Sequence, residues 1–221
     1  MSSILVIGET DGGEIKEVSQ QVAAVASGMG EVVGIVMGKN IADAAMKLAT
    51  SKIIIADDDS LEYYDPLKFT SIVSQVVEQT GATKVLVGAT TMGKDLGPRV
   101  AADLDWGYLG DCLEASNEGF VRPNFAGKVL AKSNPEGAVV ASIRNNAYPA
   151  GESWSGNVEN FNGSIPDSSL NTTSIEKVGA GTIELTEASI VVSGGRGLEN
   201  AENYEKHIRP LAASMNAAAG A

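Results

Sequence analysis

The chain has 221 residues, of which 43% are hydrophobic, so it is long enough and apolar enough for one good-sized domain and an appendage. Its formal net charge is −12, which disfavours nucleic acid and anionic membrane surfaces as partners. Cys112 is the single cysteine and cannot form an internal disulfide, so we expect a cytoplasmic protein.

The first residues and the hydropathy pattern also bear on localisation. The sequence begins "MSSILVIGETD", which lacks the basic region of a signal peptide and leads directly into a strand-like run. No apolar run approaches the ~18 residues that a membrane-spanning helix needs. We therefore expect that the chain is not an integral membrane protein.

Strand-like and helix-like segments alternate through the first half of the sequence. Apolar runs typical of strands occupy residues 4–8, 31–38, 52–57 and 84–89. Helices are expected between and after them, at residues 15–25, 40–49, 66–80 and 95–104. The third helix has Asp65 as its cap and Gly81 at its end, and the fourth has Asp95 as its cap and Pro98 in its first turn. Apolar strands joined by helices predict a parallel sheet that is covered on both faces.

The pattern changes in the second half. Short strands separated by turns between residues 110 and 148 predict antiparallel strands at the edge of the sheet. Residues 150–174 are rich in Ser, Asn and Gly and predict a partly irregular surface segment, which "TIELTEA" (182–188) follows. The chain then ends in a short strand, a glycine loop and a helix, which Pro210 should kink or restart. We expect an α/β fold with this C-terminal stub, divided into domains 1–187 and 188–221.

The loop Gly8–Glu14 follows the first strand and could approach a phosphate through its glycines. However, Glu9, Asp11 and Glu14 put negative charge where a phosphate would lie. The glycine spacing also departs from G-x-G-x-x-G. A structural turn is therefore favoured over a ligand-binding loop.

A second loop resembles a P-loop in its spacing. Gly88, Gly93 and Lys94 fit the pattern G-x-x-x-x-G-K, but Asp95 stands where a Ser or Thr should hold magnesium. A carboxylate there would repel the phosphate, so Asp95 is interpreted as a helix cap. A ligand role for this loop stays open, because such sheets bind ligands at the carboxyl ends of their strands.

Other polar residues give weaker signals. Asp57–Asp59 could contribute to a divalent metal site, but consecutive side chains diverge, which favours a solvated loop. His207 is the only histidine, and we expect it on the surface of the last helix. Trp106 and Trp154 are interpreted as packing residues. No catalytic constellation emerges, so we do not expect an enzyme.

The stretch "SGGRG" (Ser193–Gly197) lies between the last strand and the last helix. Glycines there expose backbone N–H groups close to a helix N-terminus, where the helix dipole favours an anion. The guanidinium group of Arg196 adds a rigid fork of donors that matches phosphate oxygens. From the residues alone, a phosphate-binding loop and a tight turn are equally supported.

Five segments in order resemble the α subunit of electron transfer flavoproteins. They are "ILVIGE" near the start, "GATTMGKDLGPRVAADLD", "RPNFAGKVLA" (Arg122–Ala131), "SIRNNAYPA" (Ser142–Ala150) and "VVSGGRGLENAENYE". The resemblance extends from about residue 4 to the end of the chain.

The resemblance implies a first domain related to adenine-nucleotide α-hydrolase-like folds, which packs against a β subunit that carries AMP. It implies a second domain that binds FAD, with Arg196 approaching the pyrophosphate and Gly194, Gly195 and Gly197 forming its loop. It also implies that the heterodimer takes electrons from flavin dehydrogenases, notably acyl-CoA dehydrogenases, and delivers them to a membrane quinone reductase. Lys94 would then have an architectural role.

The resemblance also implies that the Ser-Arg pair near the flavin ring, and the later ribose and adenine contacts, would follow Ala221. We therefore expect residues 188–221 to be a truncated start of the FAD-binding domain, which would not bind FAD tightly by itself. Two alternatives remain: an interaction-only relative that has lost FAD, and a stand-alone adenine-nucleotide-binding protein that uses Gly8–Glu14 and Gly88–Lys94.

Overall fold

The computed structural model describes residues 3–152, 157–176, 185 and 188–220. The chain forms two compact units, Met1–Thr172 and Thr173–Ala221, each with its own parallel sheet. The first unit contains the main sheet and the second contains the glycine-rich loop. The domain boundary at residue 187 stays a prediction.

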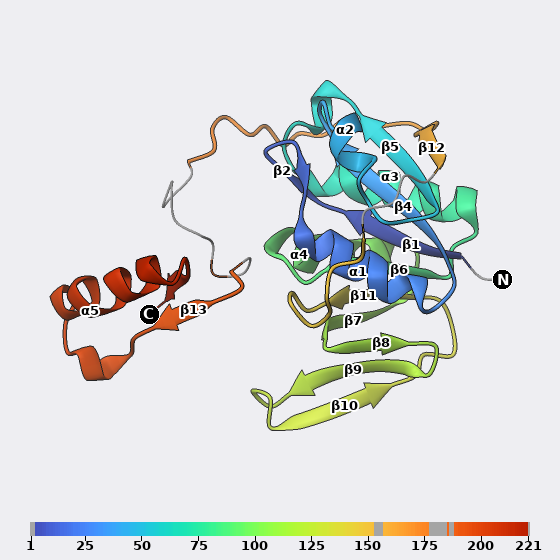
Figure 1. Ribbon diagram of the computed structural model, residues 1–221. Coiled ribbons are helices and arrows are strands. Elements are labelled where there is room, and N and C mark those ends of the chain that lie inside the picture. The colour runs from blue at the N-terminus through green and yellow to red at the C-terminus, as the bar shows by residue number, and fades with distance from the viewer. Residues whose placement is uncertain (1–2, 153–156, 177–184, 186–187, 221) are drawn as a thin grey trace. The chain divides into compact units, whose positions relative to one another are not determined.

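The first unit is built on a seven-stranded sheet in the order β12-β5-β4-β1-β6-β11-β7, in which all neighbouring strands are parallel (Figure 1). In chain order these strands are β1 (Ser3–Gly8), β4 (Glu31–Gly38), β5 (Lys52–Asp57), β6 (Lys84–Gly88), β7 (Gly107–Cys112), β11 (Val139–Ile143) and β12 (Asn157–Asn160). The strand order reverses between β1 and β6, which makes this pair the topological switch point.

Two hydrophobic cores lie on opposite faces of this sheet. Successive residues of β1 alternate between them: Ile4 and Val6 join one core, while Leu5 and Ile7 join the other. The first core includes residues of α1 (Glu17–Ser27) and α2 (Ala42–Ala45); the second includes α3 (Pro66–Thr80) and α4 (Thr91–Asp103). The prediction of a mainly parallel sheet with helices on both faces is confirmed.

The ends of α3 follow from local chemistry. The Asp65 carboxylate accepts hydrogen bonds from the backbone N–H groups of Leu67 (2.9 Å) and Lys68 (3.3 Å), and Pro66 takes the first helical position. Gly81 ends the helix with a left-handed φ of 64°. The predicted cap and end of this helix are confirmed.

The helix predicted at residues 40–49 is wrong in its extent, because α2 contains only Ala42–Ala45. Asn40 has a left-handed φ of 55°, and its N–H and that of Ile41 donate to the Asp57 carboxylate at 2.7 and 3.1 Å. These contacts prevent the helix from starting earlier. After Ala45 the chain continues in tight turns.

The predicted start of α4 is also wrong. Thr90 is the cap, and its Oγ1 accepts a hydrogen bond from the N–H of Gly93 at 2.9 Å. Asp95 therefore lies inside the helix, where its carboxylate accepts from the Tyr64 hydroxyl (2.7 Å) and the Arg99 Nε (3.0 Å). Pro98 consequently lies in the helix interior instead of its first turn.

Antiparallel strands are present as predicted, but they do not extend the main sheet. A separate three-stranded sheet contains β8 (Glu114–Ser116), β9 (Gly119–Asn124) and β10 (Val129–Ser133). All five residues of β11 are buried, and this strand pairs in parallel with β6 and β7. Burial on both faces explains why β11 belongs inside the parallel sheet.

The described part of the Ser, Asn and Gly-rich segment contains a strand that the sequence analysis missed. This strand, β12, pairs in parallel with β5. Further along, the Gln75 side chain in α3 fixes the backbone of Ser164 with two hydrogen bonds, at 2.8 and 2.9 Å. Trp106 packs against the second core, as predicted. Trp154 and most of residues 182–188 lie outside the described residues.

The second unit is a small β-α-β arrangement. In chain order it contains β13 (Val191–Ser193), the 3₁₀ helix η2 (Arg196–Leu198), α5 (Ala201–Ser214) and β14 (Ala218–Gly220). The strands β13 and β14 pair in parallel. The sequence analysis expected Pro210 to kink or restart the helix. The restart is wrong, because α5 continues through Pro210 as one helix. None of the described helices is both long and apolar enough to span a membrane.

Candidate functional site

The three glycines of the loop after β13 have different surroundings. A Cβ added to Gly194 would lie 2.2 Å from Leu198 Cδ1 of η2 and 2.8 Å from Ile208 Cγ1 of α5, so a side chain there would collide with both apolar neighbours. Added Cβ atoms at Gly195 and Gly197 would meet no heavy atom within 4 Å. Gly194 therefore serves packing, while the other two glycines leave the loop backbone accessible.

Arg196 begins η2 and its side chain is exposed. Within the described part of the chain, this side chain makes no hydrogen bond or ion pair. The first residues of a helical turn have backbone N–H groups that lack an acceptor inside the turn. The loop thus presents a free guanidinium group and unpaired backbone donors on the same short segment.

A mainly apolar hollow of about 500 Å³ adjoins this segment. Its lining comes from the loop, from η2 and from the first turn of α5: Gly194, Gly195, Arg196, Leu198, Glu199, Asn200, Ala201 and Tyr204. The structure brings Gly194, Gly195 and Arg196 together here; Gly197 is not part of the lining. The sequence analysis did not identify Leu198 as a lining residue. Tyr204 could have been found, because it starts the apolar stripe of α5.

The connection from η2 to α5 is tightly fixed. Glu199 has φ 67° and ψ −41°, and the N–H of Asn200 donates to the Leu198 carbonyl at 2.8 Å, which forms a γ-turn with a positive φ. Asn200 then caps α5 by accepting from the Asn203 N–H at 2.9 Å. This turn sets the direction in which the loop faces, at a cost in backbone strain.

The topological switch point of the first unit is occupied by protein side chains. Glu9 follows β1, and its side chain is buried with 5% of its residue surface exposed. Its carboxylate accepts a hydrogen bond from the Thr90 hydroxyl at 2.7 Å, and Thr90 follows β6. The Glu9 N–H donates to the Ser19 Oγ of α1 at 2.8 Å. A carboxylate at this position disfavours a nucleotide phosphate, as the sequence analysis anticipated.

The P-loop-like glycine has a structural reason. A Cβ at Gly93 would lie 1.9 Å from the Gly88 carbonyl oxygen, because α4 starts in close contact with the end of β6. The spacing that resembles a P-loop therefore reflects helix–strand packing.

The Gly8–Glu14 loop is a hairpin, as the sequence analysis favoured. Its strands are β2 (Thr10–Asp11) and β3 (Glu14–Ile15), which pair antiparallel. Gly12 and Gly13 form the turn with φ values of 57° and 85°, a geometry that glycine adopts without strain. The glycines of this loop are thus explained by the turn.

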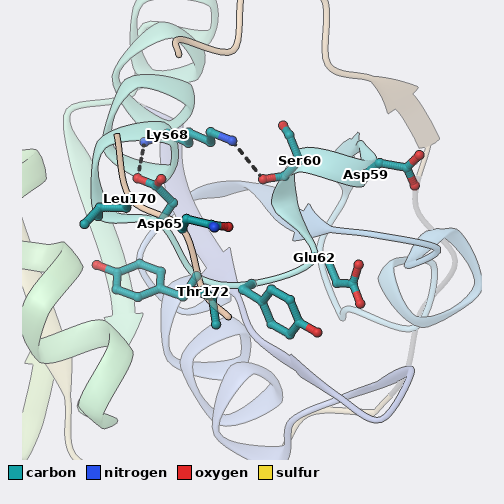
Figure 2. Close-up of a pocket in the computed structure, with 10 residues that line it drawn as sticks. Asp59, Ser60, Glu62, Asp65, Lys68, Leu170 and Thr172 are labelled. Carbon is teal, nitrogen blue, oxygen red and sulfur yellow. Dashed lines mark hydrogen bonds between the residues drawn. The ribbon is translucent and has the colours of Figure 1, made fainter. Parts of the chain in front are cut away.

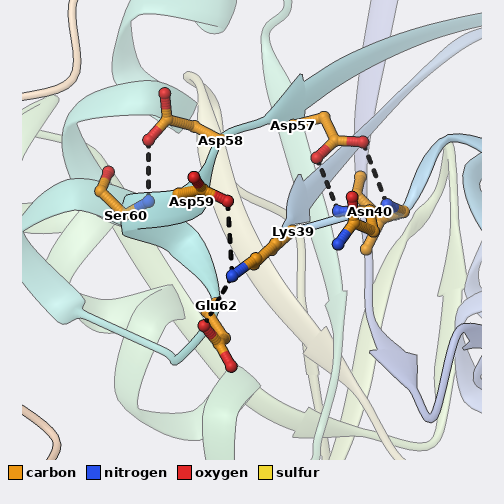
Figure 3. A network of polar contacts seen from close by, with 8 residues as sticks. Lys39, Asn40, Asp57, Asp58, Asp59, Ser60 and Glu62 are labelled. Atoms are coloured by element: carbon orange, nitrogen blue, oxygen red, sulfur yellow. Dashed lines mark hydrogen bonds and ion pairs between the residues drawn. The ribbon is translucent and has the colours of Figure 1, made fainter.

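The acidic run after β5 stabilises local backbone, as Figure 3 shows. Asp57 accepts from the N–H groups of residues 40 and 41; Asp58 accepts from the Ser60 N–H at 2.8 Å and caps the 3₁₀ helix η1 (Asp59–Leu61). Lys39 lies 3.4 Å from the Asp59 carboxylate and 3.1 Å from that of Glu62. Among the described residues, no cluster of His, Cys, Asp and Glu could hold a metal ion.

A second hollow of about 270 Å³ lies beside this run, between η1, the start of α3 and residues 170–172 (Figure 2). Carboxylates of Asp59, Glu62 and Asp65 are among its lining groups. The Lys68 ammonium group donates to the Ser60 carbonyl at 3.1 Å. The acidic lining does not suit a phosphate ligand.

A two-bond ion pair joins the ends of β7 and β11 in the first unit. The Arg144 guanidinium group binds the Asp111 carboxylate through Nε (3.0 Å) and Nη2 (2.5 Å). This bond holds the pKa of the Asp111 carboxyl below its usual value.

His207 is exposed on α5, as predicted. It is far in sequence from the polar groups described above.

Comparison with known proteins identifies the family. A family model described as "Electron transfer flavoprotein domain" matches residues 4–187, and one described as "Electron transfer flavoprotein FAD-binding domain" matches residues 184–221. The chain is 33% identical to the electron transfer flavoprotein subunit alpha of Bacillus subtilis, over 99% of this chain and 71% of that protein.

Other relatives give a consistent result. Electron transfer flavoprotein subunits alpha from Pseudomonas aeruginosa and Mycobacterium leprae are 32% and 30% identical to the chain. These matches cover 99% and 100% of this chain, and 73% and 72% of the relatives. Together with the family models, they show that the chain belongs to the electron transfer flavoprotein family, as an α subunit.

Proposed function

We propose that this chain carries electrons as one half of a heterodimer with an electron transfer flavoprotein β subunit. In this proposal the loop of the second unit holds the FAD pyrophosphate through Arg196, with Gly194, Gly195 and Gly197 shaping the loop. The observation that carries the proposal is Arg196, which is exposed on a glycine loop beside an apolar hollow and makes no hydrogen bond or ion pair with the residues that the structure describes. The FAD-binding family model that covers residues 184–221 supports it.

The residues present fit a pyrophosphate group. The guanidinium fork of Arg196 can donate two parallel hydrogen bonds to phosphate oxygens. The open space above Gly195 and Gly197 allows phosphate oxygens to approach the backbone N–H groups closely. Packing of Gly194 against α5 and the γ-turn at Glu199 would keep these donors in place. When bound, FAD would supply the redox chemistry of the protein.

The finer parts of the proposal rest on the family. We propose that the β subunit carries AMP, that flavin dehydrogenases such as acyl-CoA dehydrogenases donate electrons, and that a quinone reductase accepts them. The chain would act as a carrier in the cytoplasm and not as an independent enzyme. We propose domains 1–187 and 188–221, in line with the two family models.

The Glu9 arrangement argues against the stand-alone nucleotide-binding alternative. The switch point, where such sheets take their ligands, holds a buried carboxylate bonded to Thr90. We therefore expect calorimetry of the isolated chain with AMP, ADP or ATP to show no saturable heat. Saturable binding without a β subunit would reverse this preference.

The flavin role can be tested on the complex with the β subunit. We expect Arg196→Ala to weaken FAD binding by about 10-fold to 150-fold, since a hydrogen bond to a charged group contributes about 1.5–3 kcal/mol. Arg196→Lys should recover part of the affinity. Lys206→Ala is a control, because Lys206 is another exposed cation of this unit, lies on α5 and does not line the hollow. Flavin fluorescence gives the dissociation constants.

Two results of this experiment would contradict the proposal. An unchanged FAD affinity in Arg196→Ala would remove the role of Arg196. A complex with the β subunit that takes up no FAD at all would instead support the interaction-only relative. The Lys206→Ala control shows whether a lost positive charge on this unit is by itself enough to change the affinity.

A further inference from the structure

The hairpin of β9 and β10, residues 119–133, has features that neither the fold nor the flavin site uses. It contains the "RPNFAGKVLA" segment, and it belongs to the small antiparallel sheet outside the main parallel sheet. In the described part of the chain, β10 pairs only with β9 and is an edge strand (Figure 1). An edge strand presents backbone groups on which another chain can pair.

The tip of this hairpin holds a bulky residue in a strained conformation. Phe125, Ala126 and Gly127 have φ values of 51°, 53° and 82°, so three successive residues are left-handed. A left-handed backbone is unfavourable for residues that have a Cβ, and most unusual for a bulky side chain. Phe125 is 79% exposed, so burial of its ring against the described part of the chain does little to offset this backbone strain.

Leu130, on the adjoining strand, is a second exposed apolar residue, at 60%. It pairs across the hairpin with Pro123 and lies on the same face as Lys132, whereas Val129, 49% exposed, lies on the opposite face. Large apolar side chains that stay exposed are candidates for burial against a partner. An aromatic anchor that is strained and solvated in the free chain is explained if a partner buries it.

The hairpin also differs from the rest of the chain in its charge. Residues 119–133 contain Arg122, Lys128 and Lys132 and no acidic residue, whereas the whole chain carries a net charge of −12. Lys132 lies 3.5 Å from Glu118, just before the hairpin, and both side chains are more than half exposed. The Nε of Arg122 is buried without a hydrogen-bond partner among the described residues.

From these observations we propose that the hairpin 119–133 is a docking surface for a separate protein that presents an apolar patch bordered by carboxylates. In the function proposed above, on which this inference rests, that protein is the β subunit. Burial of Phe125 and Leu130 would supply the apolar contact, and the exposed Lys128 and Lys132 would pair with the bordering carboxylates.

The charges favour this occupant over two others. A second copy of the chain that docks hairpin to hairpin would bring the two lysines of each copy together, which is repulsive. An anionic membrane or a nucleic acid carries its negative charge far beyond the hairpin and would be repelled by the acidic remainder of the chain, whereas a protein needs carboxylates only where it faces the two lysines.

The test measures binding of the purified β subunit to the chain by calorimetry, with urea unfolding of each variant alongside. We expect Phe125→Gly to weaken binding at least tenfold and to raise the urea midpoint, because glycine relieves the left-handed strain. A merely structural role for Phe125 would not move the two readouts in opposite directions. Lys128→Glu should weaken binding further as the salt concentration is lowered.

Two exposed leucines, one on the hairpin and one outside it, control for the loss of an apolar side chain. Leu130→Ala should weaken binding at least fivefold, whereas Leu67→Ala on α3, where the side chain is 54% exposed, should leave binding unchanged. If the wild-type chain binds the β subunit and every hairpin variant binds equally well, the docking surface is wrong and the proposed function stands. If the wild-type chain does not bind, the heterodimer and this inference both fall.

The same samples test the choice of occupant. Sedimentation of the wild-type chain without the β subunit should show a monomer at micromolar concentrations. A dimer that Phe125→Gly abolishes would show that a second copy occupies the hairpin, and would overturn the proposal.

Discussion

Replacement of Gly93 by alanine should test whether the P-loop-like segment serves packing or a ligand. Gly93 lies in the first turn of α4, and an added Cβ would be 1.9 Å from the Gly88 carbonyl oxygen at the end of β6. Real Cβ atoms are essentially never closer than 3.0 Å to such a neighbour, so the gap must open by about 1.1 Å, from 1.9 to 3.0 Å. Both partners are backbone segments that cannot rotate aside.

The expected cost follows from what this movement disturbs. Leu96, Val100 and Ala101 of α4 are buried in the second core, at 0–3% exposure, so displacement of the helix start also disturbs their packing. Inserted atoms in a well-packed core typically cost about 1–3 kcal/mol, and occasionally more. Since the obstacle here is backbone, we expect at least 3 kcal/mol, which is a large part of a typical folding free energy of about 5–15 kcal/mol.

Urea unfolding followed by far-ultraviolet circular dichroism would measure this loss. Gly81→Ala is the control: Gly81 has a φ of 64°, but an added Cβ meets no atom within 4 Å, so only about 1 kcal/mol is expected from the left-handed backbone. A Gly93→Ala variant no less stable than Gly81→Ala would refute the packing argument. If that variant also lost affinity for a nucleotide, the ligand interpretation would be restored.

Three further predictions concern stability and reactivity. Asp65→Ala should cost about 1 kcal/mol in urea unfolding through loss of the α3 cap, whereas Asp58→Ala, at an exposed cap, should cost less. The Arg144 guanidinium lowers the pKa of the Asp111 carboxyl, so their bond stabilises the fold above the ordinary pKa of 3.8. The wild-type chain should therefore have a free energy of unfolding up to about 1 kcal/mol higher than Asp111→Asn at pH 7. This difference should disappear as the pH falls below 3.8. Burial raises the pKa of the Cys112 thiol to about 11, so Ellman's reagent at pH 8 should react with it only after unfolding; rapid native-state reaction would contradict this.

The parallel sheet could be predicted because its buried strands have a recognisable sequence pattern. The runs at residues 4–7 and 53–56 are continuously apolar, and only strands covered on both faces tolerate this. The position of β11 could not be read in the same way. Its sequence, "VVASI", is short and lies among hairpin-like turns, so its neighbours favoured antiparallel pairing, and only the finished sheet determines where it inserts.

Helix boundaries were harder to predict wherever a distant side chain decides them. The Asp57 carboxylate delays the start of α2, although it lies 16 residues after Ile41 in the sequence. Likewise, Thr90 displaces Asp95 as the cap of α4, because a helix that follows β6 directly must start at the first residue able to cap it. Neither contact has a periodic signal in the sequence.

In the second unit, sequence patterns identified the strand, the loop and the helix, but not the strand β14. "AAG" contains no β-branched or aromatic residue, and it becomes a strand only because β13 offers a parallel partner. The distinction among the three glycines also depends on the fold. The return of α5 brings Ile208 against Gly194, whereas Gly195 and Gly197 stay open, and a sequence cannot show which glycine a helix will approach.

Glycines allow close packing in the first unit and leave the backbone open in the second, and this difference bears on where a ligand can bind. In the first unit, Gly93 lets a helix close onto a strand, and Glu9 and Thr90 bond across the switch point, so the usual ligand position of the sheet is filled by the protein. In the second unit, the loop between β13 and η2 keeps Gly195, Gly197 and Arg196 uncovered. A doubly wound sheet that closes its own switch point gains rigidity there and gives up a binding site, in keeping with the proposal that this domain holds a partner subunit. We therefore expect substitutions at Glu9 to act on stability, and substitutions at Arg196 to act on flavin affinity.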